Sequence, residues 1–253
     1  MNEVLVIDVG NSRMKWGLRG PRGWVAQGAV ANQDIGSLAV RDWQNLERPA
    51  RAVGVNVAGE AARVRVEGQL ARWRLTMEWQ HASTQAGGVV NRYADPARLG
   101  ADRWASLVAA RRREMARGAP PRPAIVVNAG TAVTVDALDA DGVFHGGLIV
   151  PGIHLMLQSL ADNTAALRVA PGTFQDFPTS TPDALRSGAL QAVCGAIEQM
   201  RGKLAPQGSE GSEVVCYLAG GGAHEIAPQL SPPIERVDNL VLEGVLVLAS
   251  QSR

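Results

Sequence analysis

Two stretches of the chain, 120 residues apart, place a polar residue, a small residue and a glycine directly after an aliphatic run. The first reads VIDVGNSRMKWGL (residues 6–18) and the second reads VVNAGTAVTVDAL (residues 126–138). A turn rich in glycine and in hydroxyl- or amide-bearing residues points several backbone N–H groups into one concavity, which binds phosphate oxygens. The pair predicts an internal duplication with two phosphate-binding turns, although two unrelated β-hairpins would show a similar pattern by chance.

The charged residues of the first stretch suggest how a nucleotide would be held. Arg13 and Lys15 supply positive charge. Asp8 would repel a phosphate, so its expected task is to hold a hydrated Mg²⁺ that bridges the phosphates. The second stretch has Asn128 at the position that corresponds to Asp8. Two facing turns and one carboxylate together predict a site for a nucleoside triphosphate.

Other nucleotide-binding motifs are absent from the sequence. There is no G-x-x-x-x-G-K-[ST], which excludes a P-loop, and no G-x-G-x-x-G after the first strand, which argues against a dinucleotide fold. The run AGGGA at residues 219–223 follows an apolar stretch and would allow the backbone to approach a flat ring such as adenine. A plain turn would have the same composition.

The elements that must position these turns follow a similar order in both halves. In the first half we expect strands at residues 4–9, 14–18, 24–30 and 51–59, and helices at residues 37–46, 60–72 and 99–118. In the second half we expect strands at residues 125–128, 133–138, 143–151 and 214–219, and helices at residues 153–167, from about 183, and 240–250. The run Pro120-Pro121-Arg122-Pro123 cannot continue a helix, so we expect domains at residues 1–118 and 124–253.

Composition narrows the class of protein. The chain has 253 residues with 25 Lys and Arg against 24 Asp and Glu, and this balance argues against a nucleic-acid partner. The two cysteines, Cys194 and Cys216, lie in apolar contexts and are expected to be reduced and buried. Because the chain shows no signal peptide and no apolar run that could span a bilayer, we expect a soluble, cytoplasmic protein without a membrane partner.

Several further motifs occur in one order along nearly the whole chain. They are DVGNS, NRYADPAR, LGADRW, NAGTAVTVD, GGLIVPG and AGGGA. This combination resembles the type III pantothenate kinases of the actin-like ATPase superfamily, which also includes sugar and acetate kinases. The resemblance implies an α/β fold of two duplicated actin-like (ribonuclease H-like) domains, each a mixed sheet with flanking helices, facing across a nucleotide cleft. It also implies ATP-dependent phosphorylation of pantothenate to 4′-phosphopantothenate, the first step of coenzyme A synthesis.

The resemblance assigns roles to individual residues. It implies that ATP is bound by Asp8, Val9, Gly10, Asn11, Ser12, Arg13, Met14, Lys15 and Thr131. It implies that pantothenate is bound by Tyr93, Gly100, Ala101, Asp102, Arg103 and Thr181, with Thr181 supplied by the neighbouring subunit of a homodimer. Asp102 matches the catalytic base. The residue chemistry agrees, because a carboxylate can accept the proton of an alcohol, and an adjacent arginine, Arg103, can bind the carboxylate of an acidic substrate.

One residue departs from the family pattern. The family usually has aspartate where this chain has Asn128, and that aspartate helps to bind a monovalent cation, K⁺ or NH₄⁺. Asparagine keeps a carbonyl oxygen but lacks the charge, so the cation would bind more weakly, bind through other oxygens, or be unnecessary. Two alternative functions stay open at this point: a kinase for another small hydroxylated substrate, and a non-catalytic regulatory or accessory protein on the same fold.

Overall fold

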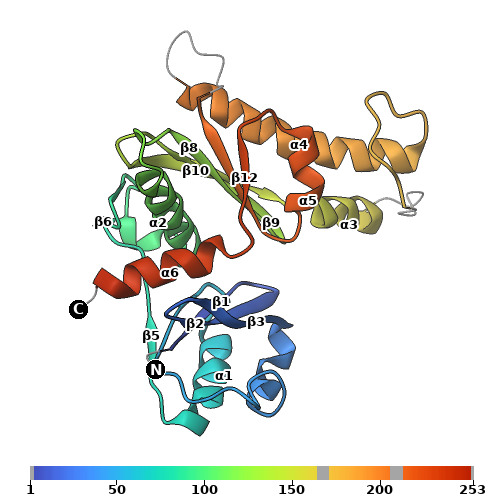
Figure 1. Ribbon diagram of the computed structural model, residues 1–253. Helices are drawn as coiled ribbons and strands as arrows, with labels where there is room; N and C mark the ends of the chain where they lie inside the picture. The colour runs from blue at the N-terminus through green and yellow to red at the C-terminus, as the bar shows by residue number, and fades with distance from the viewer. Residues whose placement is uncertain (1–2, 164–170, 206–212, 252–253) are drawn as a thin grey trace. The chain divides into compact units, whose positions relative to one another are not determined.

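The chain folds into two compact units (Figure 1). The computed structural model describes residues 3–163, 171–205 and 213–251. The first unit combines Met1–Arg113 with Asn239–Arg253, and the second covers Glu114–Asp238. This division differs from the expected domains in two respects: the boundary falls inside a helix, before the proline run, and the last helix belongs to the first unit. The physical reason for the second difference is that this helix packs on strands of the first unit.

The first unit is built on a five-stranded sheet of order β3-β2-β1-β4-β5. Its strands are β1 (Val4–Val9), β2 (Arg13–Gly20), β3 (Gly23–Ala31), β4 (Arg51–Asn56) and β5 (Met77–Trp79). β1, β2 and β3 are antiparallel neighbours, whereas β4 runs parallel to β1 and β5 runs parallel to β4. The strand expected at residues 51–59 ends three residues earlier, at Asn56, and the short strand β5 was not expected.

Helices and short elements complete the first unit. They are η1 (Asn32–Val40), α1 (Glu60–Leu70), η2 (Ala71–Trp73), β6 (Gln85–Ala86), β7 (Val89–Asn91), η3 (Pro96–Arg98), α2 (Ala101–Ala116) and α6 (Leu240–Gln251). The helix expected at residues 37–46 is instead the 3₁₀ helix η1, followed by turns. Trp43 is fully buried between Trp16, with ring centroids 6.0 Å apart, and Trp73, at 5.6 Å, and these contacts favour the turn over a longer helix.

In the second unit, five neighbouring strands repeat the strand order and the strand directions of the first unit's sheet. The order β12-β11-β8-β9-β10 corresponds strand by strand to β5-β4-β1-β2-β3. Its strands are β8 (Ala124–Ala129), β9 (Ala132–Leu138), β10 (Val143–Pro151), β11 (Val215–Ala219) and β12 (Ile234–Arg236). Because the first strands of the two sheets also lie 120 residues apart, the duplication expected from the two glycine turns extends to the whole sheet.

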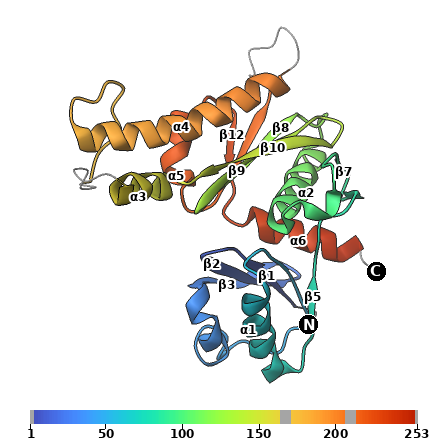
Figure 2. The same ribbon diagram turned by 180° about the vertical axis from the view of Figure 1, so that it is seen from behind.

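Helices of the second unit pack on this sheet. They are α3 (Ile153–Asn163), α4 (Thr181–Leu204), α5 (Ala223–Ile226) and η4 (Ala227–Gln229). Figure 2 shows α3 beside α4, and α4 contacts β8 and β9. The long helix begins at Thr181 because Ser180 caps it: the Ser180 hydroxyl accepts a hydrogen bond from the Asp183 backbone N–H. The last part of the helix expected at residues 153–167 lies outside the described residues.

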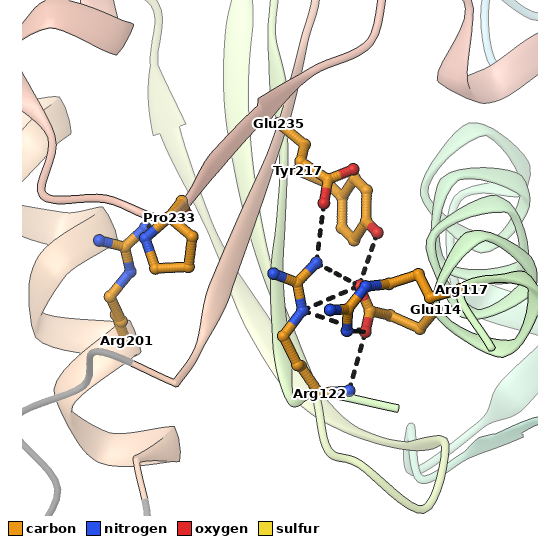
Figure 3. A network of polar contacts seen from close by, with 7 residues as sticks. All are labelled: Glu114, Arg117, Arg122, Arg201, Tyr217, Pro233 and Glu235. Carbon is orange, nitrogen blue, oxygen red and sulfur yellow. Dashed lines mark hydrogen bonds and ion pairs between the residues drawn. The ribbon is translucent and has the colours of Figure 1, made fainter. Parts of the chain in front are cut away.

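A polar network within the second unit surrounds Glu114, the residue with which this unit begins. Figure 3 shows the side chains of Arg117 and Arg122 converging on the carboxylate of Glu114, which also accepts a hydrogen bond from the Tyr217 hydroxyl at 2.7 Å. The Glu114 side chain is only 1% exposed. Its burial is made tolerable by these donors, since a buried carboxylate without partners is strongly disfavoured.

In the described parts of the chain no helix combines the length and the apolar character needed to span a bilayer.

Candidate nucleotide and substrate site

The first glycine turn joins β1 to β2. Val9 pairs with Met14 in the hairpin, and the Gly10 N–H donates to the Arg13 carbonyl at 3.1 Å. Asn11, Ser12 and Arg13 are exposed, so this part of the turn can meet a ligand. Val9 and Met14 are buried in the core of the unit. These two residues can therefore contribute to a ligand site only through their backbone.

Asp8 and Lys15 lie opposite each other at the base of this hairpin. Burial and, to a lesser extent, the negative charge of Asp102 raise the pKa of Asp8 to about 7, although Lys15 acts in the opposite direction. Because the charge of Asp102 affects the pKa of Asp8, the two carboxyl groups, 94 positions apart in the sequence, lie close enough within the first unit to interact electrostatically. The cations beside these carboxyl groups are Lys15, opposite Asp8, and Arg103, whose guanidinium acts to lower the pKa of Asp102.

Asp102 lies in the first turn of α2, where its carboxylate folds back on the preceding glycine. Its Oδ1 accepts a hydrogen bond from the Arg103 N–H at 2.8 Å. A Cβ at Gly100 would lie 2.8 Å from the same Oδ1, so the glycine leaves the room that the carboxylate occupies. Burial raises the pKa of Asp102, and the Arg103 N–H and guanidinium act in the opposite direction. A carboxyl group with a raised pKa is a stronger proton acceptor when ionised.

Arg103 and Tyr93 lie next to this carboxylate. Arg103 is 4% exposed, and the carbon of its guanidinium lies 5.8 Å from the centre of the Tyr93 ring. Tyr93 is positioned by Asn91, whose Oδ1 accepts the Tyr93 N–H at 3.0 Å and whose amide donates to the carbonyls of Ser83 and Pro96. The sequence did not indicate Asn91, because its role is recognised only from the hydrogen bonds that it makes in the folded chain to residues before and after it. Ala101 is buried at the start of α2.

The second glycine turn, between β8 and β9, is one residue shorter than the first. The Gly130 N–H donates to the Ala132 carbonyl at 3.0 Å, whereas the corresponding bond of the first turn spans one residue more. Asn128 lies at the end of β8, half-buried and paired with Thr134 on β9 and Ala219 on β11. Thr131 is exposed at the tip of the turn. Within the sheet, Asn128 has the place that Asp8 has in the first unit.

A pocket of about 240 Å³ adjoins the glycine run after β11. Gly220 has a φ of +95°, and a Cβ there would collide with the Ala129 carbonyl, so the run passes directly against the end of β8. The pocket walls also include His224, Arg236 and Asp238. The sequence indicated the glycines but not Arg236, the last residue of β12, or Asp238, two residues further on.

Thr181 lies in a groove between α3 and α4 that has a volume of about 730 Å³. Its apolar walls include Met156, Leu160 and Leu185. Asp183 fixes the segment before α4 by accepting hydrogen bonds from the Thr173 N–H at 2.8 Å and from the Ser180 hydroxyl at 2.7 Å. In this segment the Phe177 side chain is 92% exposed.

The first unit thus brings together one set of the residues singled out from the sequence. This set consists of the first turn with Asp8 and Lys15, and of Tyr93, Asp102 and Arg103. Asn128, Thr131, Thr181 and the glycine run belong to the second unit. Among the described residues, no group of three or more His, Cys, Asp or Glu side chains is arranged to hold a metal ion.

Solved structures show which fold class the duplicated sheets define. A conserved putative Baf family transcriptional activator from Campylobacter jejuni is 18% identical, with 98% of both chains covered and a TM-score of 0.63. A putative 2-dehydro-3-deoxygalactonokinase from Sinorhizobium meliloti is 14% identical, with 98% and 97% covered and a TM-score of 0.59. A putative N-acetylmannosamine kinase from Listeria monocytogenes has a TM-score of 0.54, at 11% identity over 99% of this chain and 100% of that one. These likenesses confirm the actin-like fold class expected from the sequence.

Sequence comparison narrows this class to one family. The model of the family described as type III pantothenate kinase matches residues 4–203. A type III pantothenate kinase from Leptothrix cholodnii is 47% identical, with 97% of this chain and 96% of that protein covered. Another from Acidovorax ebreus is 44% identical, with 98% and 96% covered. The chain belongs to the type III pantothenate kinase family, as its motifs indicated.

Proposed function

We propose that the protein transfers the γ-phosphoryl group of ATP to the primary hydroxyl of pantothenate and so forms 4′-phosphopantothenate and ADP, the first step of coenzyme A synthesis. The observation that carries this proposal is the pairing of Asp8 with Asp102 in one site of a chain that belongs to this kinase family. A carboxylate for the nucleotide's metal and a second for the acceptor hydroxyl are the two charges that phosphoryl transfer to an alcohol needs.

Asp102 is the proposed general base. As the substrate oxygen forms its bond to the γ-phosphorus, the hydroxyl proton passes to the Asp102 carboxylate and the bond from the γ-phosphorus to the bridging oxygen breaks, which releases ADP. The raised pKa of Asp102 supports this role, because it brings the proton affinity of the carboxylate closer to neutral pH. Its fixed position, set by the Arg103 N–H and by the space over Gly100, orients the acceptor oxygen of the carboxylate.

Arg103 and Tyr93 are the proposed contacts of the pantothenate carboxylate and chain. Arg103 is almost fully buried, and a buried guanidinium gains more from a carboxylate partner than an exposed one does. The Tyr93 ring beside it limits the directions in which the guanidinium can point. Gly100 and Ala101 precede Asp102 and offer the substrate backbone and a small side chain rather than bulk.

The turn at residues 10–12, together with Arg13 and Lys15, is proposed to bind the ATP phosphates, and Thr131 to contact them from the second turn. Mg²⁺ fits the donor set, since this ion is usually bound by one or two carboxylates together with substrate phosphates. Asp8 would hold it, because its carboxyl group lies at the base of the hairpin whose turn is proposed to bind the phosphates. When bound, the ion would neutralise charge that builds up on the phosphates during transfer.

A monovalent cation, K⁺ or NH₄⁺, is proposed to bind near Asn128 more weakly than it would near an aspartate. The Asn128 amide contributes a dipole where a carboxylate would contribute a full charge. K⁺ is weakly hydrated and is held in other proteins by neutral oxygens alone, so the loss of the charge need not remove the site.

A homodimer with a shared substrate site is the proposed assembly, and the cytoplasm the proposed location. Thr181 supports the dimer: it lines an apolar groove together with Leu160, which is partly exposed. Apolar surface of this kind is typical of protein interfaces. In such a dimer Thr181 would reach the pantothenate site of the neighbouring subunit.

The function is tested by measuring ADP release in a coupled assay, with and without pantothenate. The expected result is ATP turnover that requires pantothenate, with phosphopantothenate formed in equal amount. Turnover that responds to another hydroxylated acid or sugar but not to pantothenate would identify a different kinase. No turnover with any acceptor, from a folded protein that binds ATP, would favour a regulatory protein on the kinase fold.

A further inference from the structure

Asn32, the first residue of η1, contacts three consecutive residues of the first glycine turn. Its side-chain amide donates to the Gly10 carbonyl at 2.8 Å and to the Asn11 carbonyl at 2.9 Å. Its backbone N–H donates to the Ser12 carbonyl at 3.2 Å. A residue outside the hairpin therefore holds every carbonyl of the turn at residues 10–12.

These bonds determine where the N–H groups of the turn point. In a planar trans peptide, the carbonyl of one residue and the N–H of the next point in opposite directions. Because the Gly10 and Asn11 carbonyls point toward the Asn32 amide, the N–H groups of Asn11 and Ser12 point away from it. Two successive N–H groups directed to one side form the kind of concavity that binds an anion.

The second unit contains a counterpart of this contact. Gly152 lies 120 residues after Asn32 and likewise directly follows the third strand of its sheet. Its backbone N–H donates to the Thr131 carbonyl at 2.8 Å, as the backbone of Asn32 donates to Ser12. A Cβ at Gly152 would collide with the Gly130 carbonyl, so no side chain fits there. The backbone contact is common to both turns, and the side-chain contact belongs to the longer first turn alone.

The cost of placing Asn32 here points to the same role. Its Oδ1 is buried and accepts no hydrogen bond among the described residues. Rotating the amide by 180° would not help, because the oxygen would then face two carbonyl oxygens. Burying an acceptor without a partner is unfavourable. The amide nitrogen of Asn32 thus satisfies two carbonyls of the turn, while the Oδ1 of the same amide is left without a donor among the described residues.

We propose that Asn32 is a positioning residue of the first phosphate turn: it fixes the carbonyls of residues 10–12 so that the N–H groups of Asn11 and Ser12 point to the phosphates of ATP. This inference rests on the proposed function, because it assumes that the turn binds ATP. Asn32 acts through the turn and does not itself contact the nucleotide.

The test compares Asn32→Ala and the isosteric Asn32→Asp with Gln69→Ala. Gln69 accepts the Ala39 N–H at 3.0 Å and so holds the other end of η1 without touching the turn. We expect both Asn32 variants to raise the KM for ATP by about tenfold or more, as small misplacements of binding groups do. The KM for pantothenate and the Kd for adenosine, which has no phosphate, should change less than about twofold. Gln69→Ala should lower the melting temperature while leaving the KM for ATP unchanged.

Several outcomes would overturn the proposal. A KM for ATP in both Asn32 variants close to that of the wild type would do so, as would equal losses of ATP and adenosine binding. If Asn32→Ala does not fold, Asn32→Ser keeps one donor and should give a smaller rise in the KM for ATP than Asn32→Asp; the reverse order would contradict the role of the donors. A wild-type protein without pantothenate-dependent turnover would defeat the proposed function instead, since that result does not depend on Asn32.

Discussion

Replacing Glu114 by glutamine should remove an acid-sensitive part of the stability of the second unit. The Glu114 carboxylate accepts hydrogen bonds from the backbone of Arg122 at 2.8 Å, from its guanidinium at 2.7 Å, from Tyr217 and from Arg117 at 3.0 Å (Figure 3). Burial by itself would raise the pKa of Glu114, but the bonds from Arg122, Tyr217 and Arg117 outweigh it and lower the pKa from 4.5 to about 2. The ionised form is therefore favoured in the folded protein.

The size of the effect follows from this shift. A carboxyl group whose pKa is lower in the folded state stabilises the protein above the unfolded pKa, and the stabilisation is lost as the pH falls from 4.5 to about 2. At 1.36 kcal/mol for each pH unit, the full loss is about 3 kcal/mol, of which about 2 kcal/mol has occurred by pH 3. Arg122 and Arg117 are 23% and 35% exposed, so solvent screening lowers the expected loss at pH 3 to about 1–2 kcal/mol.

Urea unfolding followed by circular dichroism at pH 7, 5, 4 and 3 measures this contribution. At pH 7, Glu114→Gln should be less stable by about 3 kcal/mol, because Arg117 loses its anionic partner and Arg122 is left with Glu235. Between pH 5 and pH 3 its free energy of unfolding should fall less than that of the wild type, by about 1–2 kcal/mol. Glu78→Gln is the control, since the Glu78 side chain is 41% exposed in its ion pair with Arg51 and should matter by less than about 1 kcal/mol. An unchanged acid dependence in Glu114→Gln would refute the reasoning.

Three further predictions concern the active site. Asp102→Asn should leave the binding of ATP and pantothenate largely intact and lower turnover by about two to four orders of magnitude, as the loss of a general base does; near-wild-type turnover in a folded variant would exclude Asp102 as the base. Asn128→Asp should strengthen activation by K⁺ and NH₄⁺, measured as the initial rate against cation concentration with Tris and Na⁺ as controls; saturable, tight activation in the wild type that the substitution does not strengthen would contradict the charge argument. Mixing Asp102→Asn with Thr181→Arg should recover up to about a quarter of wild-type activity. Half of the freely exchanging dimers are hybrids, and each hybrid has one intact site of two, in which Asp102 and Thr181 come from different subunits. No recovery despite demonstrated subunit exchange would contradict a shared site.

The parts of the fold that could be predicted from the sequence are those set by local patterns. Period-two alternation and glycine turns predicted the hairpins β1–β2 and β8–β9 within one or two residues, because side-chain direction and turn chemistry act over a few positions. The helix expected at residues 37–46 was wrong, since its conformation depends on the contacts of Trp43 with Trp16 and Trp73. The apolar composition of the last helix indicated that it is buried, but its sequence pattern did not indicate that it packs on the first unit.

The same distinction applies to the candidate site. Asp8, the glycines and Asp102 were found because they belong to motifs whose spacing is visible in the sequence. Asn32 was not found, because it lies 22 residues from the carbonyl of Gly10 that it holds and its own surroundings, VANQD, show no motif. Asn91 was missed for the same reason, since it positions Tyr93 through hydrogen bonds that no motif indicates. Residues that bind a ligand leave a pattern in a motif, whereas residues that hold a binding loop in place are recognised by their partners.

The differences between the two turns follow from their geometry once the duplication is taken into account. Each turn is held from the first residue after the third strand, which donates its backbone N–H to a turn carbonyl. The second turn is one residue shorter, and its approach to Gly152 excludes a side chain there. The longer first turn leaves room for the Asn32 side chain, which supplies the two additional donors that a longer turn needs. The residue at the base of the hairpin also differs between the two units. Asp8 is charged when ionised and interacts with the charge of Asp102, whereas Asn128 carries no charge. The copy whose turn is longer and held at more points is thus also the copy that carries both carboxyl groups, Asp8 and Asp102.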